Sequence, residues 1–173
     1  MSDDSDLLEE LALATRLHEG PEGIRKILRS IFRQGPVPIR DLARDLGIPV
    51  PVVAAVRGEL EKRGLASRES GVQLTEQGIE VLKTSSGIAS KTRYEVTSVL
   101  DLPESLLGLV SRFAEIADAR PDADFSLDQS HATAETAIRR AIYLYENDAI
   151  EGRSVIWLGD DDLTSIAIGL VSE

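Results

Sequence analysis

Cysteine is absent from the 173-residue chain, and aromatic residues make up only 4% of it. Without cysteine the protein cannot form disulfide bonds, use a thiolate nucleophile or build a zinc site on thiolates. No apolar run approaches the roughly eighteen residues that a membrane span needs, and the polar, acidic residues 2–6 do not resemble a signal peptide. We therefore expect neither a secretory leader nor a membrane span, and the lack of cysteine agrees with a cytoplasmic location.

Charge is distributed unevenly along the chain, whose formal net charge is −11. Residues 1–20 carry one basic and six acidic side chains, residues 21–93 carry thirteen basic and eight acidic ones, and residues 94–173 carry five basic and sixteen acidic ones. A mildly basic middle and a strongly acidic C-terminal part predict two modules with different electrostatic roles. The expected organisation is an acidic helix over residues 1–21, a first domain over 22–84, a linker over 85–102 and a second domain over 103–173.

The first domain shows the order of elements that is typical of a winged helix-turn-helix fold. Apolar side chains recur at Ile24, Ile27 and Ile31 with the spacing of an amphipathic helix. The next helix is expected to end at Gly47, where a residue tolerant of positive φ is needed. The predicted elements are helices over residues 23–34, 38–47, 52–64 and 76–82 and strands over residues 65–68 and 72–75.

The third helix of this domain would enter the major groove if the domain bound DNA. It carries Arg57, Lys62 and Arg63, but Glu59 and Glu61 lie among them and repel phosphate. We therefore expect this domain to serve for homodimerisation or for docking on a neighbouring domain rather than for binding nucleic acid. The winged fold serves both uses, so DNA binding remains the alternative.

The second domain combines helices with one continuous apolar segment. Helices are predicted over residues 103–119 and from Thr133, whose hydroxyl is placed to cap its helix with Glu135 in the first turn. The apolar residues 154–158 are typical of a central parallel strand that is covered on both faces. Gly159 and an acidic cluster follow directly, and then another helix. This order predicts the start of a Rossmann-like, doubly wound α/β domain, in which ligands bind at the carboxyl ends of the strands.

Three consecutive aspartates, Asp160, Asp161 and Asp162, follow the predicted strand. Because their charge would repel a pyrophosphate, the site favours a cation, which could be a sulfonium compound, a polyamine or a metal ion. One aspartate, Asp161 or Asp162, is enough to cap the following helix, a contribution of about 1 kcal/mol. Two aspartates then remain for a functional role.

Motifs of the second domain resemble the branched-chain polyamine synthases, the N4-bis(aminopropyl)spermidine synthases formerly grouped as a predicted methyltransferase family. These motifs are LDQ at residues 127–129, TAET at 133–136, an arginine at 139 or 140, and VIWLGDDDLTS at 155–165. Leu127, Ala134 and Ala137 depart conservatively from the family's F-D-Q and T-P-E-T-T patterns. A Cys-x-x-Cys pair that some members carry between the domains is missing here, so we expect no metal. His131, between two of the motifs, is expected to be a surface residue.

The resemblance implies a winged-helix domain joined to a Rossmann-like, methyltransferase-like catalytic domain. It also implies transfer of aminopropyl groups from decarboxylated S-adenosylmethionine to spermidine, giving branched polyamines. By the same resemblance, Asp161 matches the family's catalytic position. Its carboxylate would take a proton from the attacking amine or orient that amine. The predicted substrate-binding residues are Asp128, Gln129, Thr133, Glu135, Gly159, Asp160 and Asp162.

The predicted strand over residues 154–158 meets no parallel neighbour before Glu173, and members of the family are considerably longer. Because a lone parallel strand cannot pair its backbone, we expect the chain to be an N-terminal portion of the enzyme that is inactive by itself. The alternative from another class of protein is a winged-helix transcription regulator that binds DNA and carries an acidic ligand-sensing domain.

Overall fold

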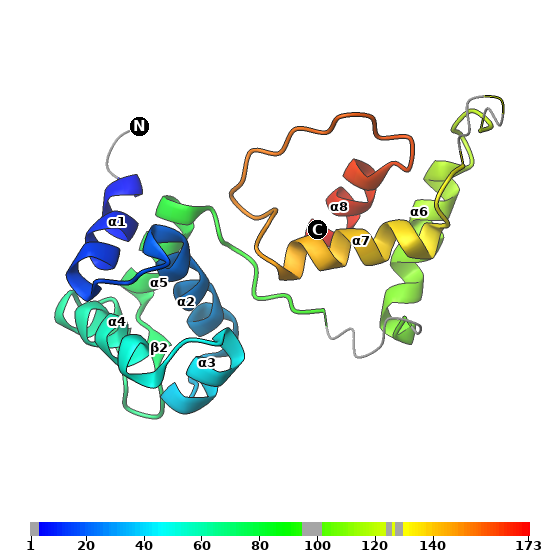
Figure 1. Cartoon of the computed structure of the whole chain (residues 1–173). Helices are drawn as coiled ribbons and strands as arrows, with labels where there is room; N and C mark the ends of the chain where they lie inside the picture. The colour runs from blue at the N-terminus through cyan, green and yellow to red at the C-terminus, as the bar shows by residue number, and fades with distance from the viewer. Residues whose placement is uncertain (1–3, 95–101, 124–125, 127–129) are drawn as a thin grey trace. The chain divides into compact units, whose positions relative to one another are not determined.

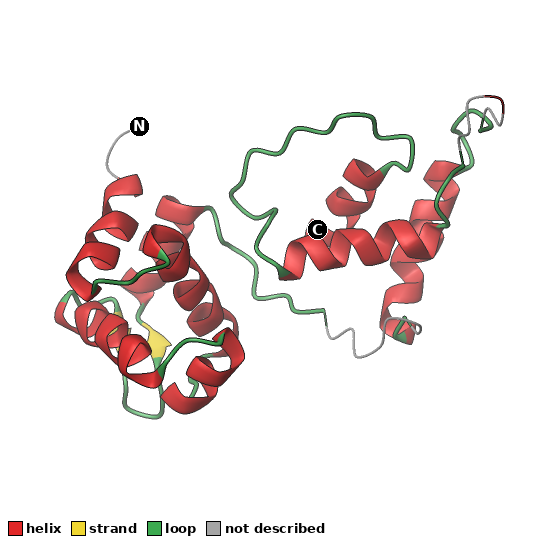
Figure 2. Cartoon of the chain, in the orientation of Figure 1, coloured by secondary structure: helices red, strands yellow, loops and turns green. Residues whose placement is uncertain are grey.

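The computed structural model describes residues 4–94, 102–123, 126 and 130–173. The chain divides into two compact units, Met1–Thr92 and Arg93–Glu173 (Figure 1). This division falls inside residues 85–102, for which the sequence predicts a linker. Both units are mainly helical (Figure 2). Among the described residues, no helix is long and apolar enough to cross a membrane.

The first unit combines helices with one short β-hairpin (Figure 1). Its elements are α1 (Asp4–Thr15), α2 (Gly20–Gln34), α3 (Ile39–Leu46), α4 (Val50–Lys62), β1 (Ala66–Ser67), β2 (Gln73–Leu74) and α5 (Glu76–Ser86). The two strands are antiparallel, with Ala66 opposite Leu74. The helices and the hairpin follow one another in the order that the hydrophobic pattern predicts.

Helix α2 provides the central buried face of the first unit. Its predicted apolar stripe is confirmed, because Ile24 and Ile27 are fully buried and Ile31 is 1% exposed. Helix α1 packs against α2, α4 and α5 and contributes the fully buried Leu11. The acidic N-terminal helix, predicted as a separate segment, therefore belongs to the core of this unit.

Two glycines fix local geometry in the first unit. Gly47 has a φ of 66° and ends α3 in the left-handed conformation, as predicted for a helix C-cap. Gly78 lies in α5, where a Cβ atom would stand 2.0 Å from the carbonyl oxygen of Leu65. A larger residue at position 78 would therefore push α5 away from the segment that leads into β1.

Helix α5 continues past residue 82, where the sequence pattern ends it. The carbonyl oxygen of Ser86 accepts a hydrogen bond from the buried Arg25 side chain at 2.5 Å, and Ile88 is fully buried. The start of the predicted polar linker therefore packs onto the first unit. A compositional argument missed this because Ile88 is a single apolar anchor among small and polar residues.

The second unit is built around α7. Its described elements are the short 3-10 helix η1 (Glu104–Leu106), α6 (Leu107–Ala117), α7 (Ala134–Glu146) and α8 (Thr164–Ser172). Helix α7 packs against both α6 and α8, and α6 also packs against α8 (Figure 1). Phe113 from α6, Ile138 from α7 and Ala167 from α8 are fully buried in the shared core. The helix predicted from Thr133 is confirmed, and so is its Thr133 N-cap.

Tyr94 anchors the start of the second unit to its helices. Its hydroxyl donates a hydrogen bond of 2.6 Å to the carbonyl oxygen of Val171, and its ring meets the buried Tyr145 edge-on at a centroid distance of 5.5 Å. The backbone N–H of Tyr94 donates to Glu146 at 2.8 Å. Tyr94 is thus fixed to α7 and α8 at once.

The predicted central strand over residues 154–158 is wrong for this structure. The segment runs as an extended loop without a strand partner among the described residues, and Ile156 and Leu158 are 86% and 92% exposed. The physical reason is the absence of a neighbour, because the described part of this unit supplies only helices and a lone strand cannot form a ladder. The Rossmann-like prediction is therefore not confirmed here, and the described chain is mainly helical with one small hairpin.

Candidate functional site

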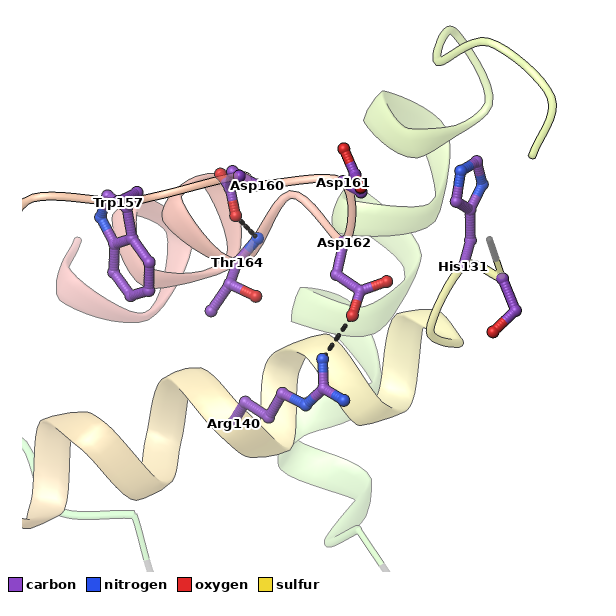
Figure 3. A pocket seen from close by; sticks show the side chains of 9 residues that line it. His131, Arg140, Trp157, Asp160, Asp161, Asp162 and Thr164 are labelled. Carbon is purple, nitrogen blue, oxygen red and sulfur yellow. Dashed lines mark hydrogen bonds and ion pairs between the residues drawn. The ribbon is translucent and has the colours of Figure 1, made fainter. Parts of the chain in front are cut away.

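The three consecutive aspartates lie in a tight turn between the extended segment and α8. Gly159 before them has a φ of 68°, and Leu163 after them has a φ of 53°, so the backbone turns sharply on both sides. The turn lines an open pocket of about 450 Å³ (Figure 3). Arg140 from α7, Trp157 from the extended segment and His131 from the segment before α7 complete most of its wall.

Asp160 caps helix α8. One carboxylate oxygen, Oδ1, accepts a hydrogen bond of 2.7 Å from the backbone N–H of Thr164, and Oδ2 accepts from the backbone N–H of Ser165 at 3.1 Å and from the Ser165 hydroxyl. These bonds satisfy backbone donors that every helix N-terminus leaves open, and the negative charge is favourable there. The capping role, assigned from the sequence to Asp161 or Asp162, belongs to Asp160.

Asp162 is engaged at both of its carboxylate oxygens. Oδ1 accepts a hydrogen bond of 2.6 Å from the backbone N–H of Ala132, and Oδ2 pairs with the Arg140 guanidinium at 2.5 Å. The bond from Ala132 makes the largest contribution to lowering the pKa of Asp162, and Arg140 and Arg120 lower it further against the opposing effect of burial. Asp162 is therefore held as an ionised, partly buried carboxylate that connects the acidic turn to two other segments.

Asp161 is the exposed member of the three. No hydrogen bond or ion pair joins it to another described residue, and in Figure 3 its carboxylate points away from Arg140. The pocket thus offers a carboxylate whose hydrogen-bonding capacity is not used by the fold. Such a group can accept a proton or bind an ammonium without first breaking a contact.

The other predicted site residues divide into three groups. Gly159 lines the pocket beside the aspartates. Thr133 caps α7 by accepting from the backbone N–H of Thr136 at 3.2 Å, and Glu135 is exposed in the first turn of that helix. Neither Thr133 nor Glu135 is part of the pocket lining. Asp128 and Gln129 lie outside the described residues.

Sequence reasoning missed several lining residues. Arg140 entered the argument only through a motif at position 139 or 140, Trp157 as part of a buried strand, and His131 as a surface residue. The available signal for Arg140 was helical spacing, since Ile138, Ala141 and Ile142 face the core and position 140 therefore lies on the outer face. For His131 the signal was its position two residues before the Thr133 cap.

Metal binding is the other use that three adjacent carboxylates suggest. Among the described residues, no group of three histidine, cysteine or carboxylate side chains is close enough to hold a metal ion. The reason is visible in the turn itself, because Asp160 is directed to the α8 backbone and Asp162 to Arg140 (Figure 3). Within the turn, Asp160 and Asp162 are thus already engaged by the fold.

Comparison with known proteins gives the pocket a context. The family model of the branched-chain polyamine synthase A C-terminal domain matches residues 108–173. An N(4)-bis(aminopropyl)spermidine synthase of Methanocaldococcus jannaschii is 32% identical over 168 residues, covering 95% of this chain and 47% of the relative. An uncharacterised protein of the same organism is 34% identical over 175 residues, covering 97% of this chain and 44% of the relative.

A solved structure is also similar. It is a mutein of the branched-chain polyamine synthase of Thermus thermophilus in complex with N4-aminopropylspermidine and 5'-methylthioadenosine. The match has 22% sequence identity and a TM-score of 0.35, and it covers 98% of this chain and 49% of that chain.

The motifs, the family model and the relatives agree on one family. Residues 108–173 match the C-terminal domain of the branched-chain polyamine synthases, which confirms the resemblance noted in the motifs. The chain spans about half the length of the curated relatives it matches. The family's C-terminal domain covers α7, the acidic turn and α8, so the pocket belongs to that domain.

Proposed function

We propose that the protein containing this chain is an aminopropyltransferase that moves aminopropyl groups from decarboxylated S-adenosylmethionine to spermidine, giving branched polyamines. The observation that carries the proposal is the unengaged carboxylate of Asp161 at the wall of an acidic pocket. The match of residues 108–173 to the family model and the names of the curated relatives support the same chemistry.

The chemistry explains why such a carboxylate is needed. The secondary amine of spermidine is protonated near neutral pH and is then no nucleophile, so one proton must leave it before attack. The free amine then forms a bond to the aminopropyl carbon next to the sulfonium of the donor. The carbon–sulfur bond breaks, its electron pair stays on sulfur, and 5'-methylthioadenosine leaves as a neutral thioether.

We assign the proton transfer to Asp161. Its carboxylate either accepts the amine proton and later releases it to solvent, or orients the amine so that the proton passes to water. Asp160 and Asp162 line the same pocket and are proposed to set its negative potential around the substrate's ammonium groups, and Gly159 is proposed to let the backbone turn beside the substrate. Asp128, Gln129, Thr133 and Glu135 stay predictions for further substrate contacts.

The fold assignments that go with this function are proposals as well. The order α2, α3, α4, hairpin, α5 supports a winged-helix domain in the first unit. The apolar run at residues 154–158 supports a Rossmann-like catalytic domain in the full protein, where added strands would pair with it. The relatives are about twice as long as this chain and so have room for those strands.

The direct test is product formation by the full-length protein. We expect purified full-length protein, given spermidine and decarboxylated S-adenosylmethionine, to form N4-aminopropylated products and to release one 5'-methylthioadenosine for each aminopropyl group transferred, as seen by mass spectrometry. A parallel gel-shift assay with duplex DNA at low salt tests the regulator alternative. Salt-sensitive DNA binding without any aminopropylated product would overturn the proposal.

A further inference from the structure

One ion pair joins three separate segments at the wall of the pocket. Arg140 projects from α7 and reaches Asp162 in the acidic turn (Figure 3). Asp162 also accepts a hydrogen bond of 2.6 Å from the backbone N–H of Ala132. The helix, the turn and the segment before the helix are thereby tied together through a single carboxylate. Asp161, the neighbour of that carboxylate, is carried on the same turn.

Rotation of the turn is restricted from both sides by these contacts. Asp160 is fixed to the N-terminus of α8 through Thr164, while Asp162 is fixed to α7 through Arg140. Asp161 is held between two anchored neighbours, although its own side chain is exposed and forms no hydrogen bond or ion pair with another described residue. The orientation of Asp161 therefore depends on the two flanking anchors, and only the anchor at Asp162 depends on a long side chain from another element.

We propose that Arg140 is a positioning residue, which acts through Asp162 to hold Asp161 in place for the substrate amine. This inference rests on the proposed aminopropyl transfer. The guanidinium also balances one of three adjacent negative charges, which would otherwise repel one another across the turn. A planar, always charged guanidinium is suited to this task because its donors are fixed relative to one another.

A different role for Arg140 predicts a different kinetic result. If the guanidinium acted mainly by repelling a polycationic substrate, its removal would lower the KM for spermidine and leave kcat in place. If it positions Asp161, its removal lowers kcat, because a small displacement of a catalytic group reduces the rate more than it reduces binding.

The test compares Arg140→Gln, Arg140→Lys and Arg112→Gln in the full-length protein. Arg112 is the matched control, because it forms an ion pair of 2.7 Å with Glu173, is about as exposed as Arg140, and does not line the pocket. We expect Arg140→Gln to lower kcat for aminopropyl transfer about 10- to 100-fold with little change in KM. Arg140→Lys should recover part of that loss, and Arg112→Gln should keep wild-type kinetics.

A double-mutant cycle shows whether Arg140 acts through Asp162. We expect kcat of the Arg140→Gln/Asp162→Asn double variant to equal that of the slower single variant, because either change breaks the same connection. Independent, multiplying losses would overturn the proposal. So would an Arg140→Gln variant that is folded, as its circular dichroism shows, and has wild-type kcat.

Hydrogen exchange adds a readout that does not depend on activity. The amide of Ala132 donates to Asp162, so its exchange should become faster in Arg140→Gln and stay unchanged in Arg112→Gln. Unchanged exchange at Ala132 in Arg140→Gln would contradict the proposed linkage. If the wild-type protein transfers no aminopropyl group, the proposed function fails and the positioning role fails with it. If the wild type is active and only the Arg140 results disagree, the positioning role fails alone.

Discussion

Asp160 accepts a hydrogen bond of 2.7 Å from the backbone N–H of Thr164 and so caps α8 from four residues upstream. Leu163 occupies the usual capping position and has no side-chain acceptor, with a left-handed φ of 53°. The capping group therefore comes from farther back along the chain. This places a structural task on the first of three adjacent aspartates and leaves the exposed second one available.

The first prediction separates the structural aspartate from the available one. We expect Asp160→Ala to lower the free energy of unfolding of the chain by about 1 kcal/mol, because backbone donors of α8 lose their acceptor. Asp161→Ala should change it by less than about 0.5 kcal/mol, as is usual for exposed positions. Urea unfolding followed by circular dichroism measures both. An equal loss in the two variants would show that the capping assignment is wrong.

The second prediction concerns acid sensitivity. The backbone N–H of Ala132 and the Arg140 guanidinium lower the pKa of Asp162 in the folded chain. A carboxyl with a lowered folded pKa contributes stability above its unfolded pKa, and this contribution is lost as the pH falls through the folded pKa. The stability difference between wild type and Asp162→Asn should thus be constant above about pH 5 and shrink below about pH 4. A difference that grows on acidification in urea titrations would contradict the assigned contacts.

The third prediction is that the first unit contributes little to nucleic-acid binding. On α4, Arg57 pairs with Glu61 at 3.3 Å and Lys62 with Glu59 at 2.6 Å, so its basic side chains already have acidic partners. We expect no sub-micromolar, salt-sensitive binding of duplex DNA in a fluorescence anisotropy assay. Tight binding by the wild type that disappears in Arg57→Ala and Lys62→Ala variants would contradict this expectation.

The fourth prediction concerns the exposed apolar segment. In the 173-residue chain, the amide hydrogens of residues 155–158 should exchange with solvent as fast as those of unstructured peptides. The reason is that these amides have no ladder partner among the described residues. Amides near Ala167 and Val171 should be protected, because α8 is packed against α7 and both side chains are buried. Slow exchange at residues 155–158 in a monomeric sample would show that this segment pairs within the chain.

The sequence predicted the helices well because their information is local. Periodic apolar residues marked α2 through Ile24 and Ile27, and Thr133 marked the start of α7 by a cap that reaches only three residues ahead. Gly47 was recognised in the same way, since its φ follows from a helix end. Each of these features depends on residues within one or two helical turns.

The failures depend on distant partners. Residues 154–158 have the composition of a buried strand, but a strand needs a neighbour, and the sequence already indicated that no parallel neighbour follows before Glu173. The pocket likewise depends on Arg140 reaching Asp162 across 22 residues, and no local pattern encodes that contact. The sequence therefore predicts a site at the aspartates without showing which of them the fold already uses.

The most direct test of the account is the turnover of Asp161→Asn in the full-length protein. Asparagine keeps the size of the side chain but can neither accept the amine proton nor balance an ammonium. Asp118→Asn, at the exposed C-terminal end of α6, is the matched control with the same chemical change outside the pocket. We predict that kcat at saturating spermidine falls about 10²- to 10⁴-fold in Asp161→Asn, with unchanged stability, and stays at the wild-type value in Asp118→Asn. Retention of more than about a tenth of wild-type turnover by Asp161→Asn, a loss far below that range, would contradict its role as the catalytic carboxylate.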